Sequence, residues 1–108
     1  KIHKAKITQA RLDYEGSITI DSKLMEKAGL LPFEKVQVVN LNNGERFETY
    51  VIKGRPDSGT ICLNGPAARL GQTGDEVIII SYGCLEPKEA QKVKPKLVYL
   101  DSKNRIIR

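Results

Sequence analysis

The stretch that decides the fold class is KVQVVNLNNGERFETYVI, residues 35–52. Two runs with alternating apolar residues flank Asn42-Asn43-Gly44, and such a turn between alternating runs is typical of a β-hairpin. Because the apolar residues recur mostly at a period of two rather than about 3.6, strands are expected on both sides of the turn. This hairpin predicts a mainly β fold.

Short runs of the same kind extend outward from the hairpin. Further strands are expected in KIHKAKITQARL, SITI, TICL, EVIIISYGCL and KLVYLD. One short helix is expected over residues 22–28, because Asp21 or Ser22 can cap its start and Gly29 follows its end. Roughly six or seven short strands joined by turns predict a closed or nearly closed β-barrel, in one domain over residues 1–108. The final SKNRIIR is expected to be a frayed basic tail.

Regular alternation assigns faces to two of these strands. Near the N-terminus it places four alternate residues on one face, namely Lys1, His3, Ala5 and Ile7. In SITI it points Ile18 and Ile20 one way, and Ser17 and Thr19 the other way.

The composition narrows the possible partners. The formal net charge is +5, but the basic residues are scattered and no aromatic residues interleave with them as on a base-stacking platform. Solvated faces explain most of this charge, and a small anionic substrate also fits it, so no nucleic-acid partner is expected. No stretch approaches the about 18 apolar residues of a membrane span, and no signal-peptide run is seen, so no membrane partner is expected.

The two cysteines indicate neither a metal site nor a required disulfide. Cys62 and Cys84 each lie in an apolar run without neighbouring His or Cys, so both are expected to be buried thiols. A reduced, cytoplasmic location is the default for such a chain. The single histidine, His3, cannot form a multi-histidine metal site, and the familiar motifs of hydrolases, P-loops and dinucleotide binding are missing.

Three stretches nonetheless carry chemical groups. In DYEGS (residues 13–17), the Gly16-Ser17 step is either an ordinary turn or a peptide bond that the protein breaks, and turn chemistry alone explains the pair. In RFETY, alternation places Arg46 and Tyr50 on one face. They offer a planar fork for a carboxylate and a phenolic proton, or form an ordinary half-exposed hairpin strand.

The third stretch is LNGPAAR, residues 63–69. It is either a turn that starts a helix or a cradle for an anion or oxyanion, built from the Asn64 amide and backbone N–H groups. Pro66 has no N–H, so Gly65 and Ala67 would have to supply those groups.

Together these stretches resemble the aspartate 1-decarboxylases, self-processing lyases that make β-alanine for pantothenate synthesis. The resemblance is carried by DYEGS (13–17), NGERFETY (43–50), LNGPAA (63–68) and GDEVIII (74–80), in order along nearly the whole chain. It implies a double-psi β-barrel with one or two short helices, assembled into a homotetramer with sites between protomers. Whether an accessory maturation factor takes part stays open.

The resemblance implies self-cleavage between Gly16 and Ser17. The Ser17 hydroxyl would attack the Gly16 carbonyl to give an ester, and β-elimination would free the chain that ends at Gly16. The dehydroalanine left at position 17 would hydrolyse to a pyruvoyl group with loss of ammonia. Thr49 is implied to help this step, although alternation turns it away from Tyr50 unless the strand bulges or the two residues serve different subunits.

The pyruvoyl group implied here is the cofactor of the family. Its carbonyl forms a Schiff base with L-aspartate and accepts the electron pair left by the departing α-carboxylate, as pyridoxal phosphate does elsewhere. The resemblance makes Tyr50 the proton donor, and Arg46 and Lys1 the cations that bind the substrate carboxylates. It places five more residues in or near the site: Asn64, Gly65, Ala67, His3 and Tyr14.

Other functions compete with this one on the residues alone. A nucleic-acid-binding barrel predicts salt-dependent binding and an intact chain. Strain-driven cleavage at Gly16-Ser17 predicts two fragments without loss of ammonia, and N-terminal nucleophile hydrolases are normally far longer than this chain. Only the decarboxylase needs both Arg46 and Tyr50 beside Ser17.

Overall fold

The computed structural model describes residues 1–108 as one eight-stranded sheet with three short helical segments. In chain order the elements are β1 (Ile2–Lys6), β2 (Gln9–Arg11), β3 (Ser17–Asp21), α1 (Ser22–Ala28), β4 (Lys35–Asn40), β5 (Arg46–Gly54), β6 (Ile61–Asn64), the 3₁₀ helix η1 (Gly65–Arg69), β7 (Glu76–Ile80), α2 (Pro87–Ala90) and β8 (Val98–Tyr99). The mainly β prediction is confirmed. Two of the strands, β2 and β8, are only three and two residues long.

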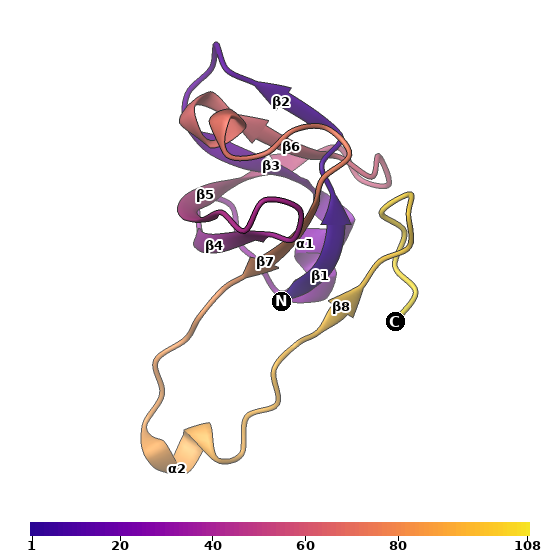
Figure 1. The fold of residues 1–108 in the computed structure, drawn as a ribbon. Coiled ribbons are helices and arrows are strands. Elements are labelled where there is room, and N and C mark those ends of the chain that lie inside the picture. The colour runs from indigo at the N-terminus through magenta and orange to yellow at the C-terminus, as the bar shows by residue number, and fades with distance from the viewer.

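The strand order is β2-β6-β3-β5-β4-β7-β1-β8, so chain order and spatial order differ throughout. Strand β3 lies in the middle of one half of the sheet, parallel to β5 and antiparallel to β6. Figure 1 shows the strands stacked into one body, with both chain ends beside it. The candidate residues of β3, β5 and β6 are therefore held on neighbouring strands.

The predicted hairpin forms between β4 and β5. The Asn40 N–H donates to the Glu45 carbonyl oxygen at 2.8 Å, and the Asn40 side chain accepts a bond from the Asn42 N–H, also at 2.8 Å. Gly44 takes a φ of 77°, which glycine adopts readily. The turn signal seen in the sequence thus sets the register of this pair.

The predicted helix α1 is also confirmed, and its cap ties two parts of the chain together. The buried Asp21 carboxylate accepts bonds from the N–H of Lys23 and the N–H of Gly59, each at 2.8 Å. Gly29 ends the helix with a φ of 77°. The bond to Gly59 fixes the turn before β6 against the end of β3.

A core of 19 buried apolar residues lies inside the sheet. On β3 it takes Ile18 and Ile20, as alternation predicts, while Ser17 and Thr19 face the other way. Burying a side chain of this size stabilises the fold by about 1.5–3 kcal/mol. This aliphatic packing holds β3 rigidly in place.

The predicted faces of the first strand are wrong. Ile2 and Ala5 are both buried, although they lie three residues apart. The reason is a bulge between them, where Lys4 takes a φ of 61° and the pairing with β7 shifts. The bulge moves His3 out of the predicted alternation.

The C-terminal tail is not frayed, contrary to the expectation. Asn104 is buried, and its side-chain N–H groups donate to the carbonyl oxygens of Lys6 and Gly59, each at 2.8 Å. Its Oδ1 also accepts the N–H of Lys6 at 2.8 Å. These long-range bonds fasten the tail to β1 and to the turn before β6.

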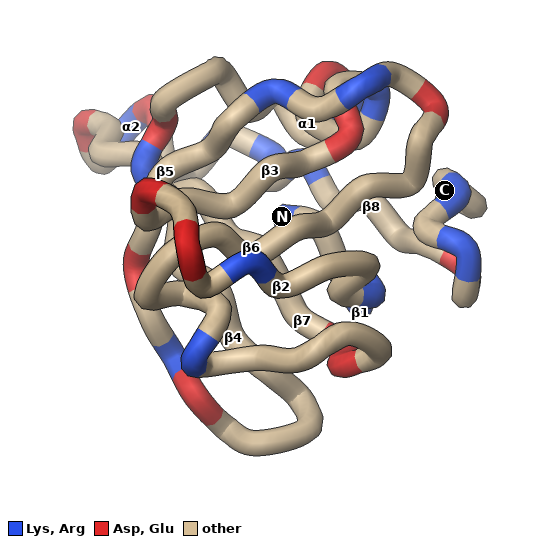
Figure 2. The backbone as a smooth tube through the Cα atoms, turned by 90° about the horizontal axis from the view of Figure 1, so that it is seen from above, with Lys and Arg blue, Asp and Glu red and all other residues tan.

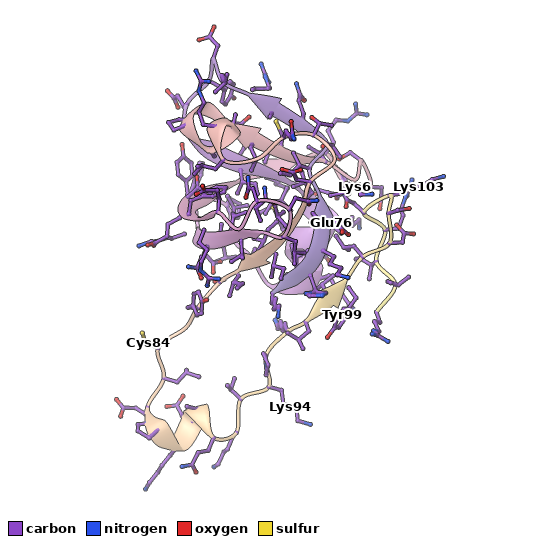
Figure 3. All side chains as sticks on the ribbon, viewed as in Figure 1. Lys6, Glu76, Cys84, Lys94, Tyr99 and Lys103 are labelled. Atoms are coloured by element: carbon purple, nitrogen blue, oxygen red, sulfur yellow. The ribbon has the colours of Figure 1, made fainter.

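Residues 83–97, named the arm here, extend away from the barrel (Figure 1). Every residue of the arm is exposed, including Cys84, so the prediction of a buried thiol is confirmed for Cys62 and wrong for Cys84. The reason is that β7 ends at Ile80, before the cysteine. Figure 3 shows Cys84 and Lys94 on the two limbs of the arm.

Charged residues do not gather on one side of the molecule. In Figure 2 the Lys and Arg positions are interspersed with those of Asp and Glu around the chain. No helix here has both the length and the apolar character needed to cross a membrane. No three His, Cys, Asp or Glu side chains are grouped so that they could hold a metal ion.

Candidate functional site

Residues from the three candidate stretches lie in one row across the sheet. Ser17 of β3 is paired with Asn64 of β6. On the other side of β3, Ile18 is paired with Val51 of β5, which places Tyr50 beside Ser17 in the same parallel register. The fold thus brings a hydroxyl, an amide and a phenol to neighbouring positions. Of these residues, Ser17 and Asn64 are the farthest apart in the sequence, at 47 positions.

The Ser17 side chain is fully buried. Its Oγ accepts a hydrogen bond from Nδ2 of Asn64 at 2.9 Å, while its own proton is directed to the Glu15 carbonyl oxygen at 3.5 Å. A bond of that length is weak. The oxygen is therefore held in place while its proton is only loosely bound, which suits a nucleophile that has to lose a proton.

The Asn64 amide is surrounded by partners on the same face. Its Nδ2 also donates to Oγ1 of Thr19 at 3.0 Å, and its Oδ1 lies 3.2 Å from Sγ of Cys62. The sequence interpretation missed Thr19 and Cys62 as site residues. The signal for them was the period of two, because each lies two residues from a candidate on its own strand.

The start of η1 presses against the residues before Ser17. Gly65 has a φ of 65°, and a Cβ built on it would lie 2.6 Å from the Tyr14 carbonyl oxygen and 2.8 Å from the Gly16 nitrogen. A Cβ on Gly16 would lie 3.3 Å from Cδ of Pro66. Only glycine fits at position 65. The close approach of Gly65 to the backbone of Tyr14 and Gly16 restricts the position of the Gly16-Ser17 peptide bond. Ala67, the other predicted donor, is buried in the core.

Strand β5 places its candidate residues on two faces. The pairing with β4 runs from Arg46 to Tyr50 without a bulge, so both residues face outward while Thr49, paired with Val36, faces the other way. Tyr50 is half-buried, with its ring 6.3 Å from that of Phe33. The predicted shared face of Arg46 and Tyr50 is confirmed.

Arg46 lies in an open cavity of about 590 Å³ on the outer face of β4 and β5. The side chain of Arg46 forms no salt bridge, whereas the neighbouring Lys35 pairs with Glu48. Three residues separate Arg46 from Tyr50 along β5, and the four steps span roughly 13 Å at about 3.3 Å per residue. Arg46 is therefore set well apart along the strand from the position beside Ser17.

Lys1 and His3 lie farther away in the sheet. His3 is in β1 and Lys1 directly precedes that strand, and three strands lie between β1 and β3 in the sheet order. The His3 ring meets the Tyr99 ring edge-on at 5.6 Å, and Figure 3 shows Tyr99 on β8. Burial lowers the pKa of His3, the positive charges of Lys1 and Lys4 lower it further, and Glu76 opposes them. The buried Nδ1 of His3 has no hydrogen-bond partner.

Tyr14 is half exposed at the turn before Ser17. The Arg11 guanidinium lies 4.8 Å from the centre of its ring, a cation–π contact. Arg11 is paired with Asn64, so it brings a positive charge to the edge of the same row. The sequence interpretation did not single out Arg11, because nothing local distinguishes it from the other scattered cations.

Comparison with known proteins shows the family of this chain. The family model described as aspartate decarboxylase matches residues 1–107. The aspartate 1-decarboxylase of Caldicellulosiruptor saccharolyticus is 62% identical over 108 residues, which cover 100% of this chain and 84% of that protein. That of Cytophaga hutchinsonii is 59% identical over 107 residues, which cover 99% and 93%.

Among solved structures, the chain is similar to the rationally designed protein mkDPBB_sym_86. The TM-score is 0.52 at 14% identity, over 73% of this chain and 95% of that one. At this identity the likeness concerns the fold alone, and it shows the double-psi β-barrel that the sequence resemblance implies.

Proposed function

This chain belongs to the aspartate decarboxylase family and converts L-aspartate to β-alanine and CO₂; we propose that it does so through a pyruvoyl group made from its own Ser17. The observation that carries the proposal is the buried Ser17 hydroxyl, which accepts a hydrogen bond from Asn64 at 2.9 Å. The preceding residue, Gly16, is closely packed against Gly65. The β-alanine formed would supply pantothenate synthesis. The single domain over residues 1–108 would be both the precursor and the source of the cofactor.

Self-cleavage starts at Oγ of Ser17. Its attack on the Gly16 carbonyl carbon forms an ester and breaks the Gly16–Ser17 C–N bond, and the Ser17 nitrogen gains the proton. Loss of the Ser17 Cα proton then breaks the Cβ–O bond, so residues 1–16 leave as a carboxylate. Water converts the remaining dehydroalanine to the carbonyl compound and releases ammonia. The buried, firmly held oxygen of Ser17 fits the first of these steps.

Thr49 has a place in this cleavage even though it faces away from Tyr50. The parallel register begins with Ile18 opposite Val51, and we infer that its continuation toward the N-terminus brings Thr49 near Gly16. Its hydroxyl would donate to the Gly16 carbonyl oxygen as negative charge develops there. Cleavage and decarboxylation would then use opposite faces of β5.

Decarboxylation needs groups that bind two carboxylates and return one proton. The pyruvoyl group, once formed, supplies a carbonyl that takes up the electron pair left by the departing carboxylate. Tyr50, beside position 17, would hold the proton that is returned to carbon. Arg46, which has no salt bridge, and Lys1 would bind and orient the substrate carboxylates.

We place these cations at the site of a neighbouring protomer, in a homotetramer. The span of roughly 13 Å between the backbone positions of Arg46 and Tyr50 along β5 supports this, because it is longer than a molecule of L-aspartate. The arm supports it too, since Leu85, Val93 and Leu97 are all more than 40% exposed in the single chain. Apolar side chains on an extended segment are typical of a contact with another chain.

The location of the protein in the cell and its need for an accessory protein stay predictions. One is the cytoplasmic location, and the other is the participation of a maturation factor in cleavage. Neither a nucleic acid nor a membrane is part of the proposed function.

The replacement of Ser17 by alanine tests the proposal. Ser17→Ala is expected to leave one intact chain that forms no β-alanine from L-aspartate, because it removes both the nucleophile and the source of the carbonyl. Ser58→Ala, at an exposed serine of another turn, is the matched control and is expected to cleave normally. A Ser17→Ala chain that still decarboxylates aspartate would refute the cofactor assignment.

A further inference from the structure

A buried thiol touches the amide that holds Ser17. Cys62 is 4% exposed, and its Sγ lies 3.2 Å from Oδ1 of Asn64 but 3.8 Å from the Leu63 carbonyl oxygen. The Asn64 oxygen is therefore the nearer acceptor for the thiol proton. Burial raises the pKa of the Cys62 thiol, with the charge of Arg11 opposing, so the thiol keeps its proton at neutral pH.

The direction of the Asn64 amide matters for the chemistry at Ser17. A side-chain amide has an oxygen on one side and an NH₂ group on the other, and a half-turn exchanges them. The two hydroxyls that Nδ2 meets, those of Ser17 and Thr19, can each donate or accept, so both accommodate either direction. They do not decide how the amide points.

Cys62 does favour one direction. Its S–H can donate to Oδ1 of Asn64, whereas sulfur is only a weak acceptor for an N–H group in the turned amide. In the direction with Oδ1 at Cys62, the Ser17 oxygen accepts a bond and its proton stays loosely held. In the turned amide, Oδ1 would accept the Ser17 proton and hold it in place, which opposes its loss.

We propose that Cys62 is a positioning residue for self-cleavage: its thiol keeps the Asn64 NH₂ group directed at the Ser17 oxygen. The inference rests on the proposed function, because it concerns the rate at which Ser17 attacks Gly16. It assigns a role to a cysteine that would otherwise only fill space in the barrel.

The test compares the wild-type thiol with two variants that lack its preference for one direction. Cys62→Ala removes the donor, and Cys62→Ser introduces a hydroxyl that, like those of Ser17 and Thr19, can donate or accept. Each precursor is incubated at neutral pH, and the two fragments are quantified over time by intact mass. The alanine chain is expected to cleave roughly five- to tenfold more slowly than the wild-type chain, as the loss of one hydrogen bond implies, and the serine chain is also expected to cleave more slowly than the wild-type chain.

Two controls separate the possible outcomes. Cys84→Ala removes the exposed thiol of the arm and is expected to cleave at the wild-type rate. Thermal unfolding of each variant shows that it is folded, and Cys62→Val, which also lacks a donor, replaces the alanine chain if that chain does not fold. Cleavage at the wild-type rate by the folded alanine or valine chain would overturn the role of Cys62. A wild-type chain that never cleaves would instead overturn the proposed function.

Discussion

Nδ2 of Asn64 lies 2.9 Å from Oγ of Ser17, and both side chains are at most 2% exposed. The contact arises from the antiparallel register of β3 and β6, in which the two residues face each other. In a site closed to water this bond is not exchanged for one to solvent, so it fixes the oxygen. The serine of the Gly16-Ser17 step thus has the fixed position that the proposed nucleophile needs.

A Cβ at position 65 should disturb the cleavage site. Gly65→Ala would place that atom 2.6 Å from the Tyr14 carbonyl oxygen and 2.8 Å from the Gly16 nitrogen, so the scissile segment has to move. We expect the variant to accumulate as an uncleaved chain, which gel electrophoresis under denaturing conditions would detect.

Gly44→Ala is the matched control for Gly65→Ala. Gly44 also has a positive φ, 77°, but nothing lies within 4 Å of a Cβ built on it. It should lower the free energy of unfolding by about 1 kcal/mol through backbone strain alone and still cleave. If Gly65→Ala cleaves as fast as Gly44→Ala, the contact with Gly16 has no part in processing.

Tyr50→Phe should separate cleavage from decarboxylation. The phenol lies beside position 17 on the face opposite Thr49, so its loss removes the proposed proton donor without touching the Gly16 side. We expect normal fragments and a kcat for β-alanine formation lowered by roughly a hundredfold or more. Near-normal turnover by Tyr50→Phe would remove it from the proposed role.

Mixed oligomers test whether the site lies between protomers. Ser17→Ala lacks the cofactor and Arg46→Ala lacks the substrate-binding cation, so each chain alone should be inactive. When the two chains are co-expressed, some sites combine an intact Ser17 with an intact Arg46 of the neighbouring chain, and decarboxylase activity should return. Mixed oligomers that form but stay inactive would place both residues in the same protomer's site.

The pH dependence of stability should reflect His3. Its pKa in the folded chain is lowered from 6.5, so at higher pH the ring is neutral in both states and has no effect. As the pH falls through 6.5, the unfolded chain binds a proton that the folded chain does not, and stability is lost until the pH reaches the folded pKa. Urea unfolding between about pH 7.5 and about pH 5.5 should show this loss. His3→Phe, which retains a ring for Tyr99, should show a smaller loss; an equal one would mean that other groups cause it.

The elements with local signals could be predicted from the sequence. The β4–β5 hairpin follows from Asn42-Asn43-Gly44, and α1 follows from its cap at Asp21 and its end at Gly29. The bulge at Lys4 could not be predicted, and neither could the ordered tail, because Asn104 binds Lys6, 98 positions away. Such features depend on contacts made in the folded barrel, and they produce no periodic pattern in the sequence.

The three stretches that contribute to the candidate site could be selected from the sequence, but their arrangement could not. Alternation placed Arg46 and Tyr50 on one face, whereas the pairing of Ser17 with Asn64 depends on the register between distant strands. Only the family resemblance connected those stretches. Cys62 was interpreted as a buried thiol, which it is; alternation places it on the same face as Asn64, but the hydrogen bond between them is known only from the fold.

The most direct test of the central claim is the intact mass of the denatured wild-type protein. We predict two fragments, residues 1–16 and 17–108, with the larger one lighter by one ammonia than a chain that starts with serine. That mass requires a carbonyl in place of the amine at position 17. A larger fragment that begins with an unmodified serine, or an uncleaved chain that decarboxylates aspartate, would contradict the account.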